Sequence, residues 1–197
     1  MDFFFVQDYR KKYRCISAEP IHNIQINFTR LQKIWIEARK RFMLLPKRIL
    51  AQEQAFERVL KSQGESIRIF HSGRFEEKRI RRKFFLFLQK QRTKHILFLI
   101  GECILLPLSG LLALLPGPNI FFGVLALVTF THWQALRGIS RLSRKSYEFV
   151  SDEDLKIWEN ALESGPERDY PIILEKMKQK FGIENLHKIL YRRKAPF

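Results

Sequence analysis

The stretch "LLALLPGPNIFFGVL", residues 111–125, lies in the middle of the most apolar part of this 197-residue chain. Pro116, Gly117 and Pro118 interrupt its run of aliphatic and aromatic side chains. Proline cannot continue a helix but is favoured in a helix's first turn, and glycine permits a tight bend. Together with Asn119, these residues predict a turn between two helices. The turn belongs either to a soluble core or to the tip of a hairpin inside a membrane.

The residues on both sides of this turn favour a membrane. Residues 93–115 are predominantly apolar and would span about 34 Å as a helix, and residues 119–136 would span about 27 Å. Between Ile96 and Thr131 the only formally charged side chain is that of Glu102. A soluble helix is rarely apolar on every side, and a chain of this size cannot cover two such helices. We therefore predict a mainly α membrane protein with a two-span transmembrane helical hairpin over residues 93–142.

The net charge of +16 lies outside the apolar residues and implies an anionic partner. Basic residues before and after the hairpin place both termini of a multi-pass protein on the cytoplasmic or matrix side. Residues 74–92 predict a basic amphipathic juxtamembrane helix, which would contact anionic headgroups of the lipid bilayer. A merely solvated helix is the alternative, and no nucleic-acid-binding motif is present. The predicted headgroup contacts are Arg81, Arg82, Lys83, Lys90, Arg92, Lys94, Arg137, Arg141 and Arg144.

The flanking regions predict two soluble parts. In residues 1–73, "DFFFVQ" and "ESIRIFHSG" predict two short strands that could pair beside a long helix, giving a small α+β part. That helix, from about Asn27 to Val59, has apolar residues three and four apart and packs on its own domain or forms a coiled-coil seam with a partner. Residues 151–197 predict a C-terminal unit of short helices, with Ser151 as the first N-cap.

Antiparallel geometry predicts that two ionisable residues of the hairpin lie level. Glu102 and His132 are equally far along the chain from Gly117, the first before it and the second after it. A carboxylate beside an imidazole can accept protons, and histidine titrates near neutral pH. The pair is therefore a candidate for a proton-linked or ion-linked role. Alternatively, the two residues are interfacial groups near the headgroups and conduct nothing.

Small residues and one proline also bear on the hairpin. Ser109, Gly110 and Gly123 lie at roughly facing depths and could allow close helix packing. Pro107 predicts either a simple kink or a broken helix of the kind that marks transporter sites.

The sequence "LLPLSGLLALLPGPNIFFGVLALVTFTHWQALRGISRL" resembles the mitochondrial potassium/proton exchange-related family. The resemblance rests on the turn Pro116–Asn119 and on four motif residues after it, His132, Trp133, Ala135 and Gly138. It extends from about Lys94 to Leu142. It implies an integral membrane protein of the mitochondrial inner membrane, or of the cytoplasmic membrane for a bacterial relative.

Two functions remain open. The first, which the resemblance implies, is a part in monovalent cation (potassium)/proton homeostasis, as an exchanger component or an accessory subunit. One hairpin cannot enclose an aqueous path, so this function would need a homo-oligomer or a membrane complex. The alternative is a membrane-anchored scaffold or adaptor without transport activity. We expect no enzyme, cofactor or metal, because no catalytic motif or ligand spacing is present. We interpret His71 as part of a surface turn, and we interpret the isolated residues His22, His95 and His187 as structural or exposed.

Overall fold

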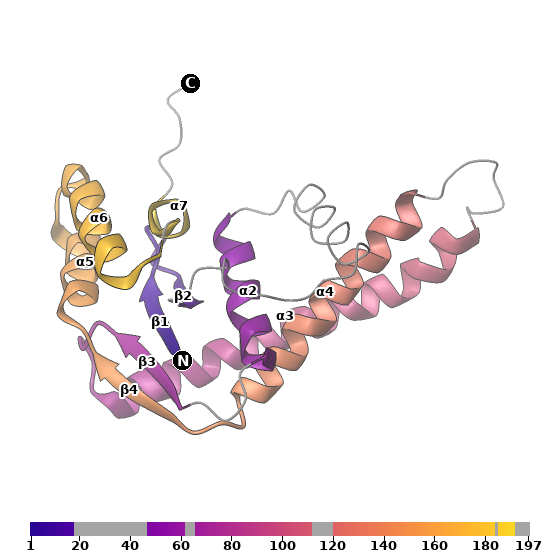
Figure 1. The fold of residues 1–197 in the computed structure, drawn as a ribbon, viewed down its shortest axis with the longest axis horizontal. Coiled ribbons are helices and arrows are strands. Elements are labelled where there is room, and N and C mark those ends of the chain that lie inside the picture. Colours follow the sequence, from indigo (N-terminus) through magenta and orange to yellow (C-terminus); the bar gives the residue numbers. More distant parts are fainter. Residues whose placement is uncertain (18–46, 62–65, 112–119, 184, 192–197) are drawn as a thin grey trace.

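The computed structural model describes residues 1–17, 47–61, 66–111, 120–183 and 185–191 (Figure 1). In these residues the chain forms a four-stranded sheet covered by helices, and a pair of long helices extends away from it.

The sheet contains strands from both ends of the chain. Its strands are β1 (Asp2–Gln7), β2 (Tyr13–Ser17), β3 (Ile67–His71) and β4 (Tyr147–Ser151), in the order β2-β1-β3-β4. β1 pairs antiparallel with β2 and parallel with β3, and β3 pairs parallel with β4. The predicted pairing of "DFFFVQ" with the strand around Ile69 is confirmed, with Phe3 opposite Ile69.

β1 is buried on both faces, so its residues show no alternation of apolar and polar side chains. Phe3 and Phe5 enter one core with Ile69 of β3 and Phe84. Phe4 enters the opposite core. A run of consecutive aromatic residues therefore forms a central strand because each face of the sheet is covered by helices.

The helices divide between these two faces. The first core includes side chains of α2 (Lys47–Lys61), α3 (Glu77–Leu111) and α4 (Ile120–Leu142). The opposite core includes α5 (Glu153–Ser164), α6 (Tyr170–Phe181) and α7 (Leu186–Leu190), with a 3-10 turn at Glu167–Asp169 before α6. The three predicted C-terminal helices are confirmed. The first is capped by Asp152, not by Ser151, because the Asp152 carboxylate accepts from the backbone N–H groups of Asp154 and Leu155.

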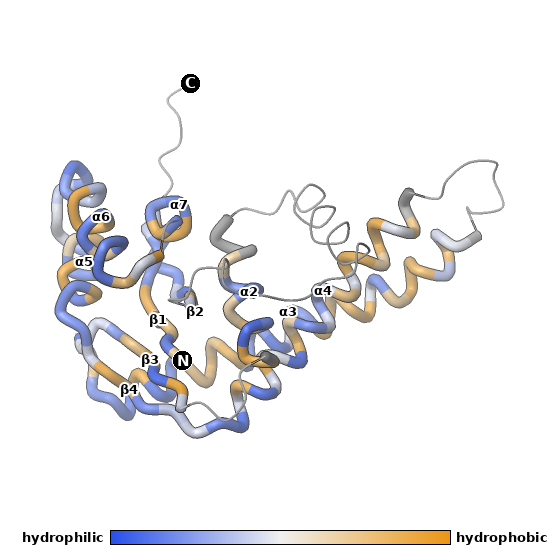
Figure 2. Tube along the Cα trace, viewed as in Figure 1, coloured by the Kyte–Doolittle hydropathy of each residue, from blue (hydrophilic) through white to orange (hydrophobic). Residues whose placement is uncertain are grey.

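α3 and α4 pack against each other and extend beyond the sheet. α3 has 35 residues and is about 52 Å long at 1.5 Å per residue. Its first turns cover the sheet, and its apolar second half continues outward beside the first half of α4 (Figure 2). We call residues 95–111 and 120–134 the apolar arm, and the other described residues the α+β unit.

The predicted fold class is wrong. The chain is α+β with a four-stranded sheet, and in the described residues only one helix, α3, is long and apolar enough to cross a membrane. The prediction of two spans treated α4 as an equivalent helix. However, α4 turns polar side chains inward, since Thr131 and His132 are buried, and Arg137 and Arg141 shorten its apolar part.

The strands β2 and β4 were not predicted. Both are short and carry charged residues, Arg14 in one and Glu148 in the other, so their sequences lack a clear strand pattern. β4 joins the sheet beside β3 and brings the predicted C-terminal unit onto the same core as residues 1–17. The segment predicted as a basic juxtamembrane helix, 74–92, is continuous with the apolar half of α3. Of the long helix predicted from Asn27, only α2 lies within the described residues.

Candidate functional site

The structure brings Glu102 of α3 and His132 of α4 into direct contact. Glu102 Oε1 lies 2.5 Å from His132 Nδ1, and both side chains are buried. The His132 ring also stacks on Phe98, with ring centroids 5.1 Å apart. Burying a charged pair costs desolvation energy, so such a pair persists only with good hydrogen-bond geometry. At this distance the two side chains form a hydrogen bond, in which the histidine tautomer decides which group donates.

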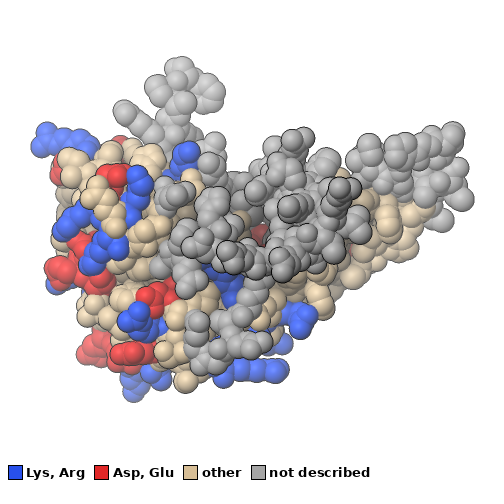
Figure 3. Space-filling view, viewed as in Figure 1, with Lys and Arg blue, Asp and Glu red and all other residues tan. Residues whose placement is uncertain are grey.

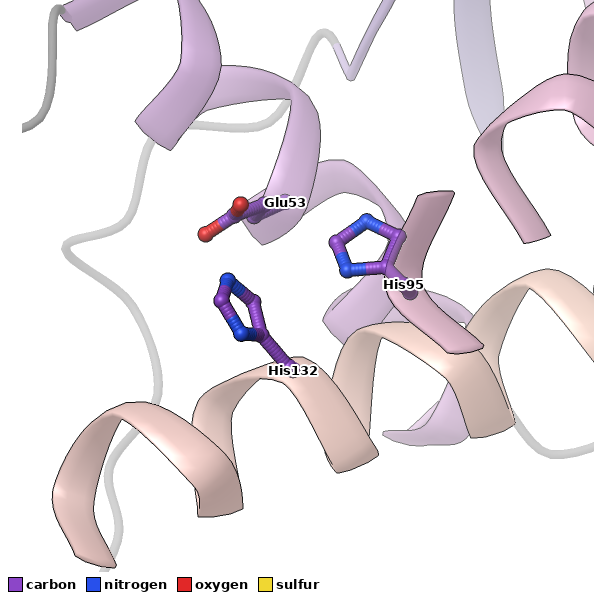
Figure 4. Close-up of side chains that lie close together, drawn as sticks. All are labelled: Glu53, His95 and His132. Carbon is purple, nitrogen blue, oxygen red and sulfur yellow. The ribbon is translucent and has the colours of Figure 1, made fainter. Parts of the chain in front are cut away.

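Two further ionisable side chains surround this pair. Glu53 of α2 and His95 of α3 are buried, with exposed fractions of 3% and 1%. The ligand atoms of Glu53, His95 and His132 all lie within 4.8 Å of one another, so these three residues could hold a metal ion. Figure 4 shows the Glu53 carboxylate and the two rings pointing into one shared space. We call Glu53, His95, Glu102 and His132 the buried cluster.

Gly138 brings α2 close enough to α4 to form this cluster. A Cβ atom at position 138 would collide with the backbone oxygen of Phe56 in α2. Ala135, one turn earlier on α4, is also buried, and Glu53 lies one turn before Phe56 on α2. His132, Ala135 and Gly138 are three residues apart, so they line the face of α4 that meets α2.

The polar atoms of the cluster are only partly paired within the described residues. His95 Nδ1 and Glu102 Oε2 are buried and have no hydrogen-bond partner there. Buried oxygens of Gln52, Gln91 and Gln134, on the same three helices, also lack a partner within that part of the chain. A buried polar atom without a partner costs about 1–3 kcal/mol, so these groups indicate a site that accepts a proton, an ion or water.

The outer surface of the apolar arm is exposed and apolar. Only 17% of the most apolar part of α3 is buried inside the protein. Charged side chains gather on the α+β unit, and the visible part of the arm shows few of them (Figure 3). Most of the large exposed apolar residues of the described part of the chain lie on this surface, and patches of this kind mark membrane or protein contacts. Its large exposed residues include Leu97, Phe98, Ile100, Ile104, Leu105, Leu108, Phe122, Phe130 and Trp133.

The residues predicted to contact lipid headgroups lie at the base of the arm and along the first half of α3. Several have partners inside the protein. Arg81 pairs with Glu77, and Lys83 Nζ lies 3.4 Å from the centroid of the Phe75 ring. Arg141 donates to the backbone oxygen of Leu60. Arg82, Lys90, Arg92, Arg137 and Arg144 are exposed, and Lys94 is half-buried.

The small residues of the arm do not mark a close helix contact. A Cβ atom at Gly110 or Gly123 would meet no atom within 4 Å in the described residues. The Ser109 hydroxyl donates to the backbone oxygen of Leu106 in its own helix. α3 continues through Pro107 as a helix. The predicted turn, Pro116, Gly117, Pro118 and Asn119, lies outside the described residues.

Comparison with known proteins agrees with the resemblance. The family model described as mitochondrial K⁺–H⁺ exchange-related matches residues 8–145. The chain belongs to this family. The match is much longer than the segment that carried the resemblance, and it contains the entire buried cluster. No curated protein and no solved structure matches the chain.

Sequence reasoning identified two of the four residues of the buried cluster. It brought Glu102 and His132 together by counting from the turn, but it interpreted His95 as isolated. A signal for His95 was available, because His95 and Glu102 are seven residues apart and lie on one face of α3. Glu53 gave no signal, since its distance from α3 depends on how α2 packs. His71, interpreted as a surface turn, is buried at the end of β3, and its Nδ1 accepts from the Gly73 N–H group.

Proposed function

We propose that this protein is a membrane-anchored component of a monovalent cation (potassium)/proton exchange system, and that the Glu102–His132 pair accepts the proton. The observation that supports this most is the 2.5 Å contact between these two buried side chains in the apolar arm. The choice of potassium and protons as the exchanged ions comes from the description of the family as K⁺–H⁺ exchange-related. The proposal assigns no enzymatic reaction.

The chemistry of the pair suits proton uptake. Histidine titrates near neutral pH, and ionisable groups inside a membrane cost several kcal/mol unless they are paired, so they are retained mainly for function. A proton that arrives at the pair changes its net charge by one. Exchange with a cation needs such a change, because the site must favour a proton in one state and a cation in the other.

Membrane attachment in this proposal depends on α3. Its apolar half is long enough for a bilayer and mostly exposed. Exposed basic residues at the base of the arm, such as Arg92 and Arg137, favour anionic headgroups and would keep the α+β unit on the matrix or cytoplasmic side. The family description names mitochondria, so the location that we propose is the mitochondrial inner membrane, and a bacterial cytoplasmic membrane is the equivalent for a bacterial relative.

A single arm cannot enclose a path for ions, so exchange would require a homo-oligomer or a complex with a transporter. The exposed apolar surface of the arm is available for such contacts as well as for lipid. The same surface supports the second candidate function, a membrane-anchored scaffold that moves no ions itself. The buried cluster favours the first function, because a scaffold has no use for acids and histidines buried beside one another.

The test is ion flux in proteoliposomes that contain only this protein. We expect a potassium gradient to drive proton movement, measured with an internal pH dye, and Glu102→Gln to remove most of it. Glu148→Gln is the matched control, since Glu148 is exposed on β4 and should leave the flux unchanged. Absence of flux with the unmodified protein would support the scaffold or the accessory role. Equal flux in both variants would exclude Glu102 as the proton acceptor.

A further inference from the structure

We propose that Glu53, His95 and His132 bind a divalent transition-metal ion of the zinc class, and that Glu102 orients His132 from the other side of its ring. This inference goes beyond the proposed function, because metal binding would hold whether or not the protein moves ions. It concerns three residues from three different helices, α2, α3 and α4.

The donor set is one that zinc uses. Two imidazoles and one carboxylate bind Zn²⁺ in sites that leave a fourth position open, with bonds of about 2.0–2.2 Å. Ligand atoms around such an ion are about 3.3 Å apart in a tetrahedron. The three candidate atoms lie within 4.8 Å of one another, so small rotations of the side chains would close the site.

Glu102 supplies the support that metal-bound histidines normally have. A ligating histidine usually donates its other ring N–H group to a carboxylate, which fixes the tautomer and the ring orientation. Glu102 Oε1 lies 2.5 Å from His132 Nδ1 and so leaves Nε2 as the ligand atom. The stacking of the His132 ring on Phe98 further restrains it. This carboxylate–histidine arrangement is observed independently of the three-residue group.

His95 offers a nitrogen that nothing else in the described residues occupies. Its side chain is 1% exposed, and its Nδ1 atom has no hydrogen-bond partner in that part of the chain. Its ring centroid is 5.4 Å from that of His132, at an interplanar angle of 61°. Two rings held edge to face at this distance can turn one nitrogen each toward a common ion.

The donor atoms of the site also suit a transition-metal ion. Zinc and its neighbours are favoured over magnesium or calcium, because those two ions prefer oxygen ligands and this site offers two nitrogens.

The sequence alone could not show this site. Metal motifs are recognised by short spacings, whereas Glu53, His95 and His132 lie far apart in the chain. The close approach of α2 at Gly138 makes them neighbours. The sequence-based expectation of no metal was drawn from the lack of spacing, which is uninformative for a site assembled from three helices.

The test is metal binding by the full chain, purified in detergent with a tag that contains no histidine and stripped with a chelator. Zn²⁺ is titrated by calorimetry, and Co²⁺ serves as a visible probe of tetrahedral coordination. We expect one Zn²⁺ per chain and a visible Co²⁺ band that Zn²⁺ removes. His95→Ala should weaken binding at least about 100-fold, and Glu102→Gln about 10–100-fold, the usual effect of removing a supporting carboxylate.

His187→Ala is the matched control, because His187 is exposed on α7 and should leave Zn²⁺ affinity unchanged. If His95→Ala does not fold, Glu53→Gln is used in its place, because it preserves the size of the side chain. It should also weaken Zn²⁺ binding. The proposal is overturned if the unmodified protein binds no stoichiometric Zn²⁺, or if the cluster variants and His187→Ala bind it equally. Neither result depends on ion flux, so this proposal and the proposed function can fail separately.

Discussion

The α+β unit and the apolar arm use the same kinds of side chain in opposite ways. In the α+β unit, apolar residues are buried on both faces of the sheet and charged residues cover the outside. In the arm, apolar residues lie outside, whereas an acid and two histidines lie inside. The first arrangement is typical of a protein in water, and the second is typical of a surface that contacts lipid or another protein.

The largest expected effect is a contrast between one buried and one exposed apolar side chain. Trp158 is fully buried, and its indole N–H donates to the backbone oxygen of Gln7. We expect Trp158→Ala to lower the free energy of unfolding in detergent by about 3–5 kcal/mol. Leu97 is 63% exposed on the arm, and Leu97→Ala should change this free energy by less than about 0.5 kcal/mol. A large loss with Leu97→Ala would mean that the arm is covered by protein, as in an oligomer.

The next effect is at the junction of the two regions. Gly138→Ala would place its Cβ atom against the backbone of Phe56. We expect a loss of about 3 kcal/mol in the free energy of unfolding, because backbone has to move. The control is Gly123→Ala, whose Cβ meets nothing within 4 Å in the described residues, and which should be neutral or slightly stabilising. Equal stabilities of the two variants would contradict the close contact of α2 with α4.

The two cysteines report the environment of each region. Cys103 is exposed on α3. In a Cys15→Ser background, its labelling rate can be compared with that of a cysteine introduced by Ser143→Cys, directly after the end of α4. In membranes permeabilised so that both faces are accessible, we expect a charged maleimide to label position 143 about 100-fold faster than Cys103, a difference of about 2.7 kcal/mol, because the proposed membrane insertion would place lipid over Cys103. Equal rates would place the arm in water.

Cys15 in the unmodified chain provides a separate control. It is fully buried in the α+β unit, and this burial raises the pKa of its thiol to about 12. Little thiolate is therefore present at the pH of labelling, and only the thiolate reacts. Cys15 should remain unlabelled until the protein is denatured. Labelling in the native protein would mean that the sheet opens.

The smallest expected effect is a pH dependence inside the α+β unit. Burial raises the pKa of Glu159, whose carboxylate accepts from Ser72 and from the Gln7 N–H group. The native state therefore holds this proton more tightly than the unfolded state. The stability from this group is complete below the unfolded pKa of about 4.3 and is lost as the pH rises through the native pKa.

Glu159→Gln should remove this dependence. The stability of the unmodified protein minus that of the variant should fall as the pH rises from 4 to 7, measured by thermal unfolding in detergent. Glu148→Gln, at an exposed position, should show no such change. A constant difference for Glu159→Gln would contradict a raised pKa.

Sequence reasoning succeeded where one local pattern decides the structure. It predicted β1 from its aromatic run, β3 from its alternation and the helices after β4 from their breaks. It missed β2 and β4, because short strands with charged residues become strands only when a neighbour pairs with them. It also treated α4 as a second membrane span, because composition does not show which face a helix turns inward.

The sequence by itself predicted the pairing of the two helices and the equal level of Glu102 and His132, because helix rise is a local property and both residues are equally far along the chain from Gly117. Only the tertiary structure decided that His95 and Glu53 join them, since α2 reaches the site through its contact at Gly138. It also decided that β4 closes the sheet beside β3 and unites both ends of the chain in one unit. Such long-range contacts depend on how helices and strands pack, and no spacing in the sequence records them.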